Sequence, residues 1–283
     1  MASTCYACIL DRAKFECDLV FKDDEDKKRA IEELLDFMVS HKGGVPALVG
    51  TQRELIIKRR SNNPDPYKDL KDEENRVASG LIPLARQFYL KSIDKVEALV
   101  RIAAAANSME FGVKGHDYDN STFGRIFADT LCENLKGDLS SVEERLTSFD
   151  NVIYLTDNAG EVVFDLFVIE KLQGLGKRVV MASKSEPILN DVTAEELKSM
   201  TANEVIPTGS VVGTTLDATN EEALSLLLNK DWLVISKGMG NFETISEFES
   251  RLAGRLIYIL RAKCEPVAGA LGVARGALVV KAV

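Results

Sequence analysis

The spacing of apolar positions changes along the chain near residue 150. Before that point, apolar side chains recur every three or four residues, which is typical of amphipathic helices. This spacing predicts helices over residues 27–40, 82–90 and 91–106, with a proline-containing turn over residues 61–66. No convincing strand pattern occurs in this half, so residues 1–148 are expected to form an all-helical domain.

After residue 150, short apolar runs alternate with helical segments. Such alternation is typical of a mostly parallel sheet with helices on both faces. We therefore expect residues 149–283 to form a three-layer α/β domain. The predicted strands are residues 152–155, 178–181, 204–206, 232–235, 256–260 and 277–281, and the predicted helices are residues 162–173, 194–199 and 221–228.

The first predicted strand ends in adjacent polar residues. Asp157 and Asn158 follow it, and Gly160 and Glu161 lead into the next helix. Glycine permits a tight turn there, and a helix N-terminus offers free N–H groups to an anion. Ligands of open parallel sheets bind at this carboxyl edge. The simpler interpretation is that Asp157 or Asn158 only caps the helix.

The second predicted strand ends in a similar place. Asp191 follows it and precedes another helix. By itself Asp191 would be an ordinary helix cap. Taken with Asp157 and Asn158, it supplies a third oxygen from a neighbouring strand end. Two carboxylates and an amide suit a hard or borderline divalent cation and leave room for water.

A third predicted strand runs into a lysine followed by two glycines, Lys237, Gly238 and Gly240. One cation and several backbone N–H groups at a strand end can surround a phosphate. The alternative is a glycine turn with a solvated lysine. A dinucleotide-binding fingerprint is absent, because the glycines at 174 and 176 precede a strand instead of following one.

Composition excludes several classes of function. The formal net charge of −9 argues against a nucleic-acid surface, which needs clustered Lys and Arg. No apolar run approaches the ~20 residues of a membrane helix. The N-terminus lacks the regions of a secretory signal, so a cytoplasmic protein is expected. A small phosphorylated metabolite remains a suitable partner, because positive charge gathered at one site can outweigh the negative net charge of the whole chain.

The five cysteines show no spacing of a disulfide framework and are expected to be reduced. Cys5 and Cys8 face one side of a helix, and Cys17 points away from Cys8. A four-cysteine zinc site lacks its second pair unless Cys264 folds back, so packed core thiols are the preferred interpretation. The two histidines, at positions 41 and 116, are expected to be structural.

At this point the sequence resembles the damage-control phosphatase family, formerly the domain-of-unknown-function 89 family. Its blocks occur in the family's order over nearly the whole chain. The pair Cys5 and Cys8 resembles the mark of the stand-alone microbial subfamily. The blocks are residues 62–67, 106–112, 157–161, 187–191, 236–241 and 263–267.

The resemblance implies a helical domain joined to a Rossmann-like domain with metal-dependent phosphatase activity. By resemblance, Asp157, Asn158 and Asp191 are the metal ligands, Lys237 binds phosphate and Asn107 contributes to substrate binding. Substrates would be sugar phosphates, damaged nucleotides or phosphopantetheine-like esters. The chain departs from the family's usual blocks at four positions that are expected to affect substrate preference. These positions are Ala106, Ser185, Glu186 and Met239.

The expected reaction is metal-assisted hydrolysis of a phosphomonoester. The metal would be Mn²⁺, Ni²⁺ or Co²⁺ in preference to Mg²⁺. Lys237 with the Gly238 and Gly240 N–H groups would offset phosphoryl charge, and Glu161 would orient or deprotonate water. The competing hypotheses are an aspartyl-phosphate phosphatase, an S-adenosylmethionine-dependent carboxyl methyltransferase and a non-enzymatic phosphometabolite-binding protein. The oligomeric state is left open.

Overall fold

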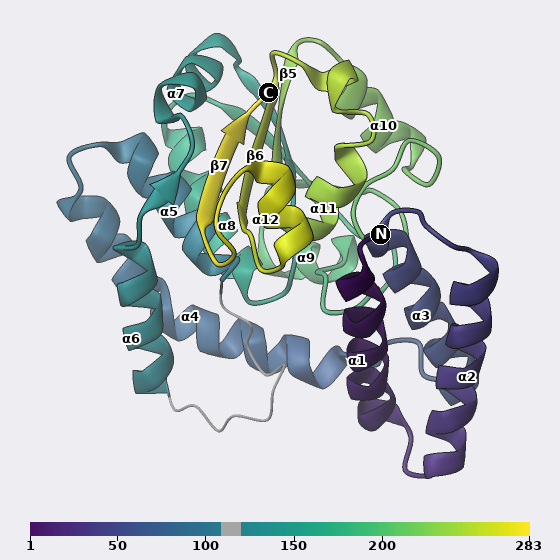
Figure 1. The fold of residues 1–283 in the computed structure, drawn as a ribbon. Helices are drawn as coiled ribbons and strands as arrows, with labels where there is room; N and C mark the ends of the chain where they lie inside the picture. The colour runs from purple at the N-terminus through teal and green to yellow at the C-terminus, as the bar shows by residue number, and fades with distance from the viewer. Residues whose placement is uncertain (109–119) are drawn as a thin grey trace.

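The computed structural model describes residues 1–108 and 120–283, so His116 and part of the block 106–112 lie outside the described residues. Helices fill the first part of the chain, and strands alternate with helices in the second (Figure 1). No described helix is both long and apolar enough to cross a membrane. The helices are α1 (Ser3–Val20), α2 (Asp24–Ser40), α3 (Pro46–Ser61), α4 (Lys68–Lys91), α5 (Lys95–Ala106), α6 (Asn120–Leu131), α7 (Leu139–Ser148), α8 (Glu161–Gly174), α9 (Ala194–Met200), α10 (Glu221–Leu228), α11 (Gly238–Ile245), the 3₁₀ turn η1 (Glu249–Leu252) and α12 (Glu265–Leu271).

Seven strands form one sheet in the order β1-β7-β6-β5-β2-β3-β4. They are β1 (Leu135–Lys136), β2 (Asn151–Leu155), β3 (Arg178–Ser183), β4 (Glu204–Pro207), β5 (Trp232–Lys237), β6 (Leu256–Arg261) and β7 (Leu278–Ala282). All neighbouring strands are parallel except β6 and β7. The chain proceeds outward from β2 through β3 and β4, and from β5 through β6 and β7. The order therefore reverses between β2 and β5, which is where open α/β sheets bind ligands.

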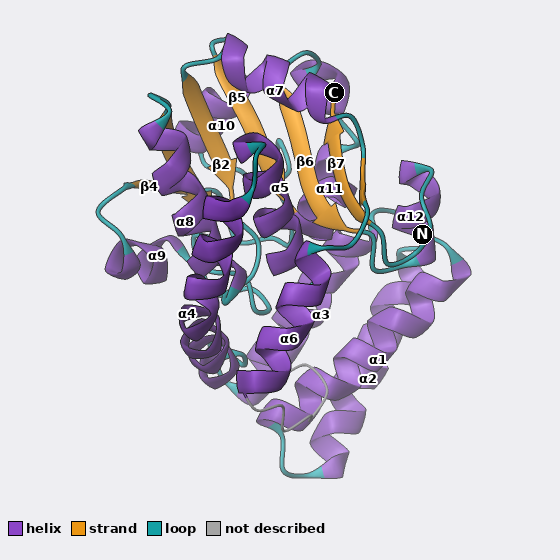
Figure 2. Cartoon of the chain, turned by 90° about the vertical axis from the view of Figure 1, so that its left-hand side faces the viewer, coloured by secondary structure: helices purple, strands orange, loops and turns teal. Residues whose placement is uncertain are grey.

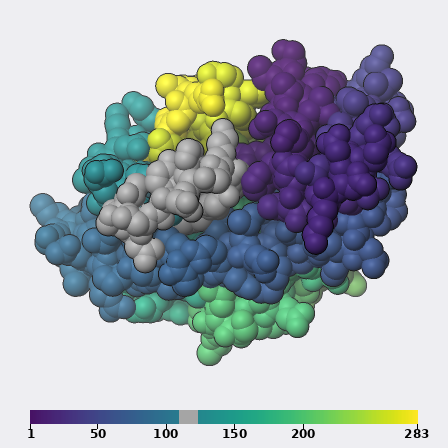
Figure 3. All heavy atoms as spheres, turned by 90° about the horizontal axis from the view of Figure 1, so that it is seen from below, coloured from purple at the N-terminus to yellow at the C-terminus, as the bar shows by residue number. Residues whose placement is uncertain are grey.

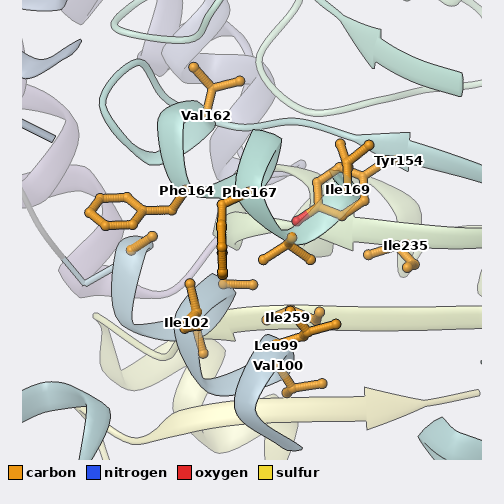
Figure 4. Close-up of a cluster of buried hydrophobic side chains, with 14 of the residues drawn as sticks. Leu99, Val100, Ile102, Tyr154, Val162, Phe164, Phe167, Ile169, Ile235 and Ile259 are labelled. Atoms are coloured by element: carbon orange, nitrogen blue, oxygen red, sulfur yellow. The ribbon is translucent and has the colours of Figure 1, made fainter. Parts of the chain in front are cut away.

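Alternate side chains of the central strands enter two different cores, as the period of a strand requires. Val152 and Tyr154 of β2 pack against helices on one face, where α5 and α8 meet the sheet (Figure 4). Ile153 and Leu155 enter the other core with apolar residues of α10, α11 and α12. The fold is the expected three-layer, mostly parallel α/β arrangement. The parallel strands point their carboxyl ends towards the side where α3 and α4 lie (Figure 2).

The first three helices bury a core of their own, to which Ile9 of α1, Leu34 of α2 and Ile57 of α3 contribute. The later helices of the first half do not form a separate core. Leu81 of α4 and Ile102 of α5 belong to the same buried cluster as the sheet. The last helix before the central sheet, α7, ends at Ser148, and β2 begins at Asn151. The part of the first half with a core of its own is the helical unit α1–α3.

Two expectations for the first half were wrong. A strand exists there: β1 pairs with β7 in parallel, and its two residues are too few to give a periodic signal. The predicted helix over 91–106 is also divided, because α4 ends at Lys91 and α5 begins at Lys95. Asp94 caps α5 by accepting a hydrogen bond from the Glu97 N–H at 2.8 Å.

Candidate metal centre and substrate cavity

The reversal between β2 and β5 brings Asp157 and Gly238 into contact. Each follows the end of its strand, beyond the paired residues Leu155 and Ser236. Gly238 has a φ of +77°, and a Cβ at this position would lie 1.8 Å from Oδ2 of Asp157. Only glycine therefore lets this loop pass so close to the Asp157 carboxylate.

Asp191 reaches the same place from the loop after β3. An isolated antiparallel bridge pairs Asn158 with Asp191, and the Val192 N–H donates to the Asp157 carbonyl at 3.1 Å. The Asp191 side chain is buried, and its Oδ2 lies 3.6 Å from Nζ of Lys184. The backbone thus holds the three predicted ligand residues side by side.

Two asparagines hold the carboxylates in fixed positions. Nδ2 of Asn107 donates to Asp157 Oδ2 at 3.0 Å and to Glu161 Oε1 at 2.7 Å. Nδ2 of Asn158 donates to the same two oxygens at 3.0 and 2.8 Å. Oδ1 of Asn107 accepts from the Arg261 N–H at 2.9 Å, so β6 orients this amide. Within the described residues, Oδ1 of Asn158 accepts no hydrogen bond and is left to bind a ligand.

Lys237 lies beneath the site. Its side chain is fully buried, and Nζ donates to Glu161 Oε2 at 2.9 Å and to Asp165 Oδ1 at 2.7 Å. The Tyr154 hydroxyl donates to the same Asp165 oxygen at 2.7 Å. Direct contact of Lys237 with phosphate therefore stays a prediction, and in this structure its Nζ is taken up by two carboxylates. Lys237 instead pairs with Glu161 from below and fixes its orientation.

We expect Lys237→Met to lower the free energy of unfolding by about 3–5 kcal/mol, because it leaves buried carboxylates without their cation. Lys171→Met is a matched control, since Lys171 pairs with the exposed side chain of Glu170. Such exposed pairs contribute at most about 1 kcal/mol. Chemical denaturation of both variants measures the difference. Equal losses would show that the buried lysine is not the partner that holds these carboxylates.

The carboxyl groups of the site repel one another. The pKa of Asp157 is raised well above its usual range by burial, and further by the charges of Glu161 and Asp191. Burial also raises the pKa of Asp191 to about 6, against the opposing charge of Lys184. For Glu161, burial would raise the pKa, but Lys237 and Lys263 outweigh it and lower the pKa. A cation between the aspartates would remove their repulsion.

The donor set therefore fits a divalent cation. Among the described residues, no group of three or more His, Cys, Asp or Glu side chains could hold a metal. The candidate set contains instead two aspartates and the unsatisfied amide oxygen of Asn158. Oxygen donors of this kind suit a hard or borderline ion and leave positions for water and substrate.

A cavity of about 260 Å³ opens beside Asn158. The loops at the strand ends form one wall, to which Asn190, Gly240 and Lys263 contribute. The first helices form the other wall, with Arg12 from α1 and Arg53 from α3. The cavity therefore lies between the helical unit and the carboxyl edge of the sheet, and its walls carry several positive charges.

Three side chains of this region could not be singled out from the sequence. Lys263 lines the cavity, and its charge lowers the pKa of Glu161 and opposes the rise at Asp157. Arg53 lies on α3, and Oδ1 of Asn75 on α4 accepts from the Gly160 N–H at 2.8 Å. The block 263–267 was noticed only as part of the resemblance. Nothing in the spacing of Arg53 or Asn75 sets them apart from ordinary helix residues.

The cysteines divide between the core and the surface. Cys5 and Cys17 are buried, as expected for packed thiols, but Cys8 is exposed and lines the cavity, so the core interpretation was wrong for it. Burial raises the pKa of the Cys264 thiol, and nearby Cys5 and Cys8 raise it further. The N-terminal helix and the C-terminal segment indeed lie side by side (Figure 3). All five cysteines are free.

Comparison with known proteins identifies the family of this chain. A family model of the damage-control phosphatase ARMT1-like domain matches residues 1–279. A damage-control phosphatase of Archaeoglobus fulgidus is 29% identical over 287 residues, which cover 99% of this chain and 98% of that protein. An uncharacterized protein of Methanocaldococcus jannaschii is 33% identical over 283 residues, covering 95% of this chain and 91% of its own length.

A solved structure resembles the whole fold. The crystal structure of a family 89 protein from Pyrococcus horikoshii superimposes with a TM-score of 0.87 at 28% sequence identity. The match covers 99% of this chain and 97% of that chain. The similarity therefore includes both the helical unit and the sheet.

Proposed function

Because this chain belongs to the damage-control phosphatase ARMT1-like domain family, we propose that it is a metal-dependent phosphatase acting on small phosphorylated metabolites. One observation carries the proposal: Asp157, Asn158 and Asp191 meet at the reversal of strand order, beside a cavity with positively charged walls. Relatives that match nearly the whole chain are named damage-control phosphatases. That name supports substrates that are damaged or surplus phosphate esters.

Asp157, Asn158 and Asp191 are the residues that would hold the cation, which we propose is Mn²⁺, Co²⁺ or Ni²⁺ in preference to Mg²⁺. When bound, it supplies a Lewis acid for a phosphoryl oxygen and lowers the pKa of water. Asn107 and Asn158 keep the Asp157 and Glu161 carboxylates in fixed orientations through their paired amide hydrogen bonds. Fixed charges need no rearrangement during the reaction.

The remaining groups act on the phosphate and on water. Lys263 lines the cavity and offsets the charge of the phosphoryl oxygens, a role that the buried Lys237 leaves open. The N–H groups of Gly238 and Gly240, at the start of α11, are the proposed backbone donors. Glu161 stays ionised because Lys237 lowers its pKa, so we propose that it orients the attacking water or accepts its proton.

Three alternatives are less well supported. An aspartyl-phosphate mechanism usually has a second acid two residues after the nucleophile, where this chain has the buried Ala159. A methyltransferase usually has a glycine-rich loop after its first strand, where this chain has only Gly160. Solvent-oxygen labelling in a single turnover separates water attack from attack by Asp157. Catalysis itself excludes a binding protein without activity.

The test of the proposed function is phosphate release from a panel of phosphate esters after removal of metal. We expect chelated protein to lose activity and to regain it with Mn²⁺, Co²⁺ or Ni²⁺ several-fold better than with Mg²⁺. Metal content is measured in the same samples. Full activity in a preparation verified as metal-free would contradict the proposal, and equal recovery with Mg²⁺ would contradict the metal preference.

A further inference from the structure

The cavity differs in charge from the rest of the protein. The chain as a whole carries a formal net charge of −9. The residues that line the cavity include three cations, Arg12, Arg53 and Lys263, and only one carboxyl group, Glu243. Burial raises the pKa of Glu243 to about 7, which reduces its negative charge. An acidic protein has thus concentrated positive charge in one concave place, which favours an anionic ligand.

Arg53 is the most deeply buried of the three cations. It is only 5% exposed, and its Nε donates to Glu16 Oε2 at 2.9 Å. This hydrogen bond uses one of the five N–H donors of the guanidinium group, and Arg53 also lines the cavity. The charge of Arg53 is paired with that of Glu16, and burial raises the pKa of the neighbouring Glu54 to about 10, so Glu54 adds no second negative charge beside Arg53. A buried guanidinium with unused donors binds carboxylate or phosphate in a forked geometry.

Arg53 and the metal centre belong to opposite walls of the cavity. Asn158 and Lys263 come from loops at the strand ends, whereas Arg53 comes from α3 in the helical unit. Because Asn158 and Arg53 line opposite walls of the cavity, an anion bound by Arg53 is a different group from a phosphate bound at the metal centre.

We propose that the substrate carries a second anionic group on its leaving-group side, a carboxylate or a phosphate, which Arg53 binds with support from Arg12. This inference rests on the proposed phosphatase function and narrows its substrate class to bisphosphates and phosphate esters of acids. The cavity volume of about 260 Å³ suits a small substrate of this kind. Arg53 is a specificity-determining residue and takes no part in the reaction at phosphorus.

The experiment uses pairs of phosphate esters in which one member carries a distal carboxylate and the other does not. In the first pair, 4-carboxyphenyl phosphate is compared with its carboxamide, and in the second, 6-phosphogluconate with glucose 6-phosphate. We expect the metal-loaded wild type to favour the charged member of at least one pair about tenfold or more in kcat/KM. Arg53→Gln should bring that ratio close to one, mainly through KM, because it removes the charged fork.

Two further variants separate specificity from folding. The double variant Glu16→Gln with Arg53→Gln replaces the buried ion pair by a neutral pair. It should lose the same preference in kcat/KM for the charged substrate, and it provides the test if Arg53→Gln alone does not fold. Arg60→Gln, on the same helix but bonded to the part-exposed Glu33, should keep the wild-type ratio. An equal loss for both members of each pair would overturn the proposal, because it would indicate a purely structural role.

Binding without turnover distinguishes failure of this inference from failure of the proposed function. Calorimetry with 4-carboxyphenyl phosphonate and its carboxamide measures the same preference in a compound that cannot be hydrolysed. If no ester is hydrolysed with any metal, the phosphatase function fails, but a preference for the carboxylate that is lost in Arg53→Gln still supports the anion site. A wild type with no preference for any charged member overturns it.

Discussion

Replacing Asp157 or Asp191 by Asn should remove metal binding and turnover together. Each change deletes one negative charge from the proposed ligand set and keeps the shape of the side chain. We expect turnover to fall on the order of 10²–10³-fold, as when a single charge-stabilising group is removed from an active site. Mn²⁺ at 100 times its Kd should stabilise the wild type by about 2.7 kcal/mol and the variants much less. Thermal melts with and without Mn²⁺, beside a phosphatase assay, measure both effects.

The metal-free variants should melt no lower than the wild type. Burial raises the pKa of both aspartates, and nearby carboxylates raise it further, so loss of one charge relieves repulsion. Asp138→Asn is the control for a simple helix cap, because Asp138 accepts from the Ser140 and Ser141 N–H groups at the start of α7. If Asp157→Asn and Asp191→Asn both behave like Asp138→Asn, with normal activity and a normal response to metal, neither aspartate is a ligand.

Gly238→Ala should inactivate the protein although it changes no polar group. The new Cβ would lie 1.8 Å from Asp157 Oδ2 and 2.2 Å from its Cγ, so the carboxylate must move. A displacement of about 1 Å in an active site can reduce the rate about 10²-fold. We expect a loss of at least that size in kcat/KM, with weaker metal binding. Steady-state kinetics across a metal titration measures both.

Gly176→Ala is the control for backbone strain without a collision. Gly176 has a φ of +84°, close to that of Gly238, but a Cβ there meets nothing within 4 Å. Both variants should lose about 1–2 kcal/mol of stability from the left-handed backbone, and only Gly238→Ala should lose activity. The double variant Asp157→Ala with Gly238→Ala should regain stability relative to Gly238→Ala, because the collision is gone. Similar activity of the two glycine variants would contradict the contact with Asp157.

The sheet could be predicted from the sequence because its signal is local. Buried central strands such as β2 and β5 each contain four consecutive apolar residues, 152–155 and 232–235, and helices with a regular apolar spacing separate them. The strand order could not be predicted in this way. It depends on which strands pair across the reversal, and no short-range pattern records that β2 lies beside β5.

Site residues that directly follow predicted strands could be predicted from the sequence. Those whose position depends on how distant elements pack together could not. Asp157 and Asp191 follow predicted strands, so their place at one edge could be inferred. The burial of Lys237 could not, because its partner Asp165 lies one turn after Glu161 on α8, where an acidic residue looks like an ordinary helix position. Arg53 was missed for a similar reason, since its approach to the site depends on how α3 docks.

The separate core of α1–α3 has a consequence for how such enzymes diverge. Ile9, Leu34 and Ile57 bury their side chains among these helices and not in the sheet, so the helices hold together through their own contacts. Substitutions on the cavity side of α3, including position 53, therefore leave this core unchanged. We expect such substitutions to change which compounds the protein accepts while the residues around Asp157 stay the same.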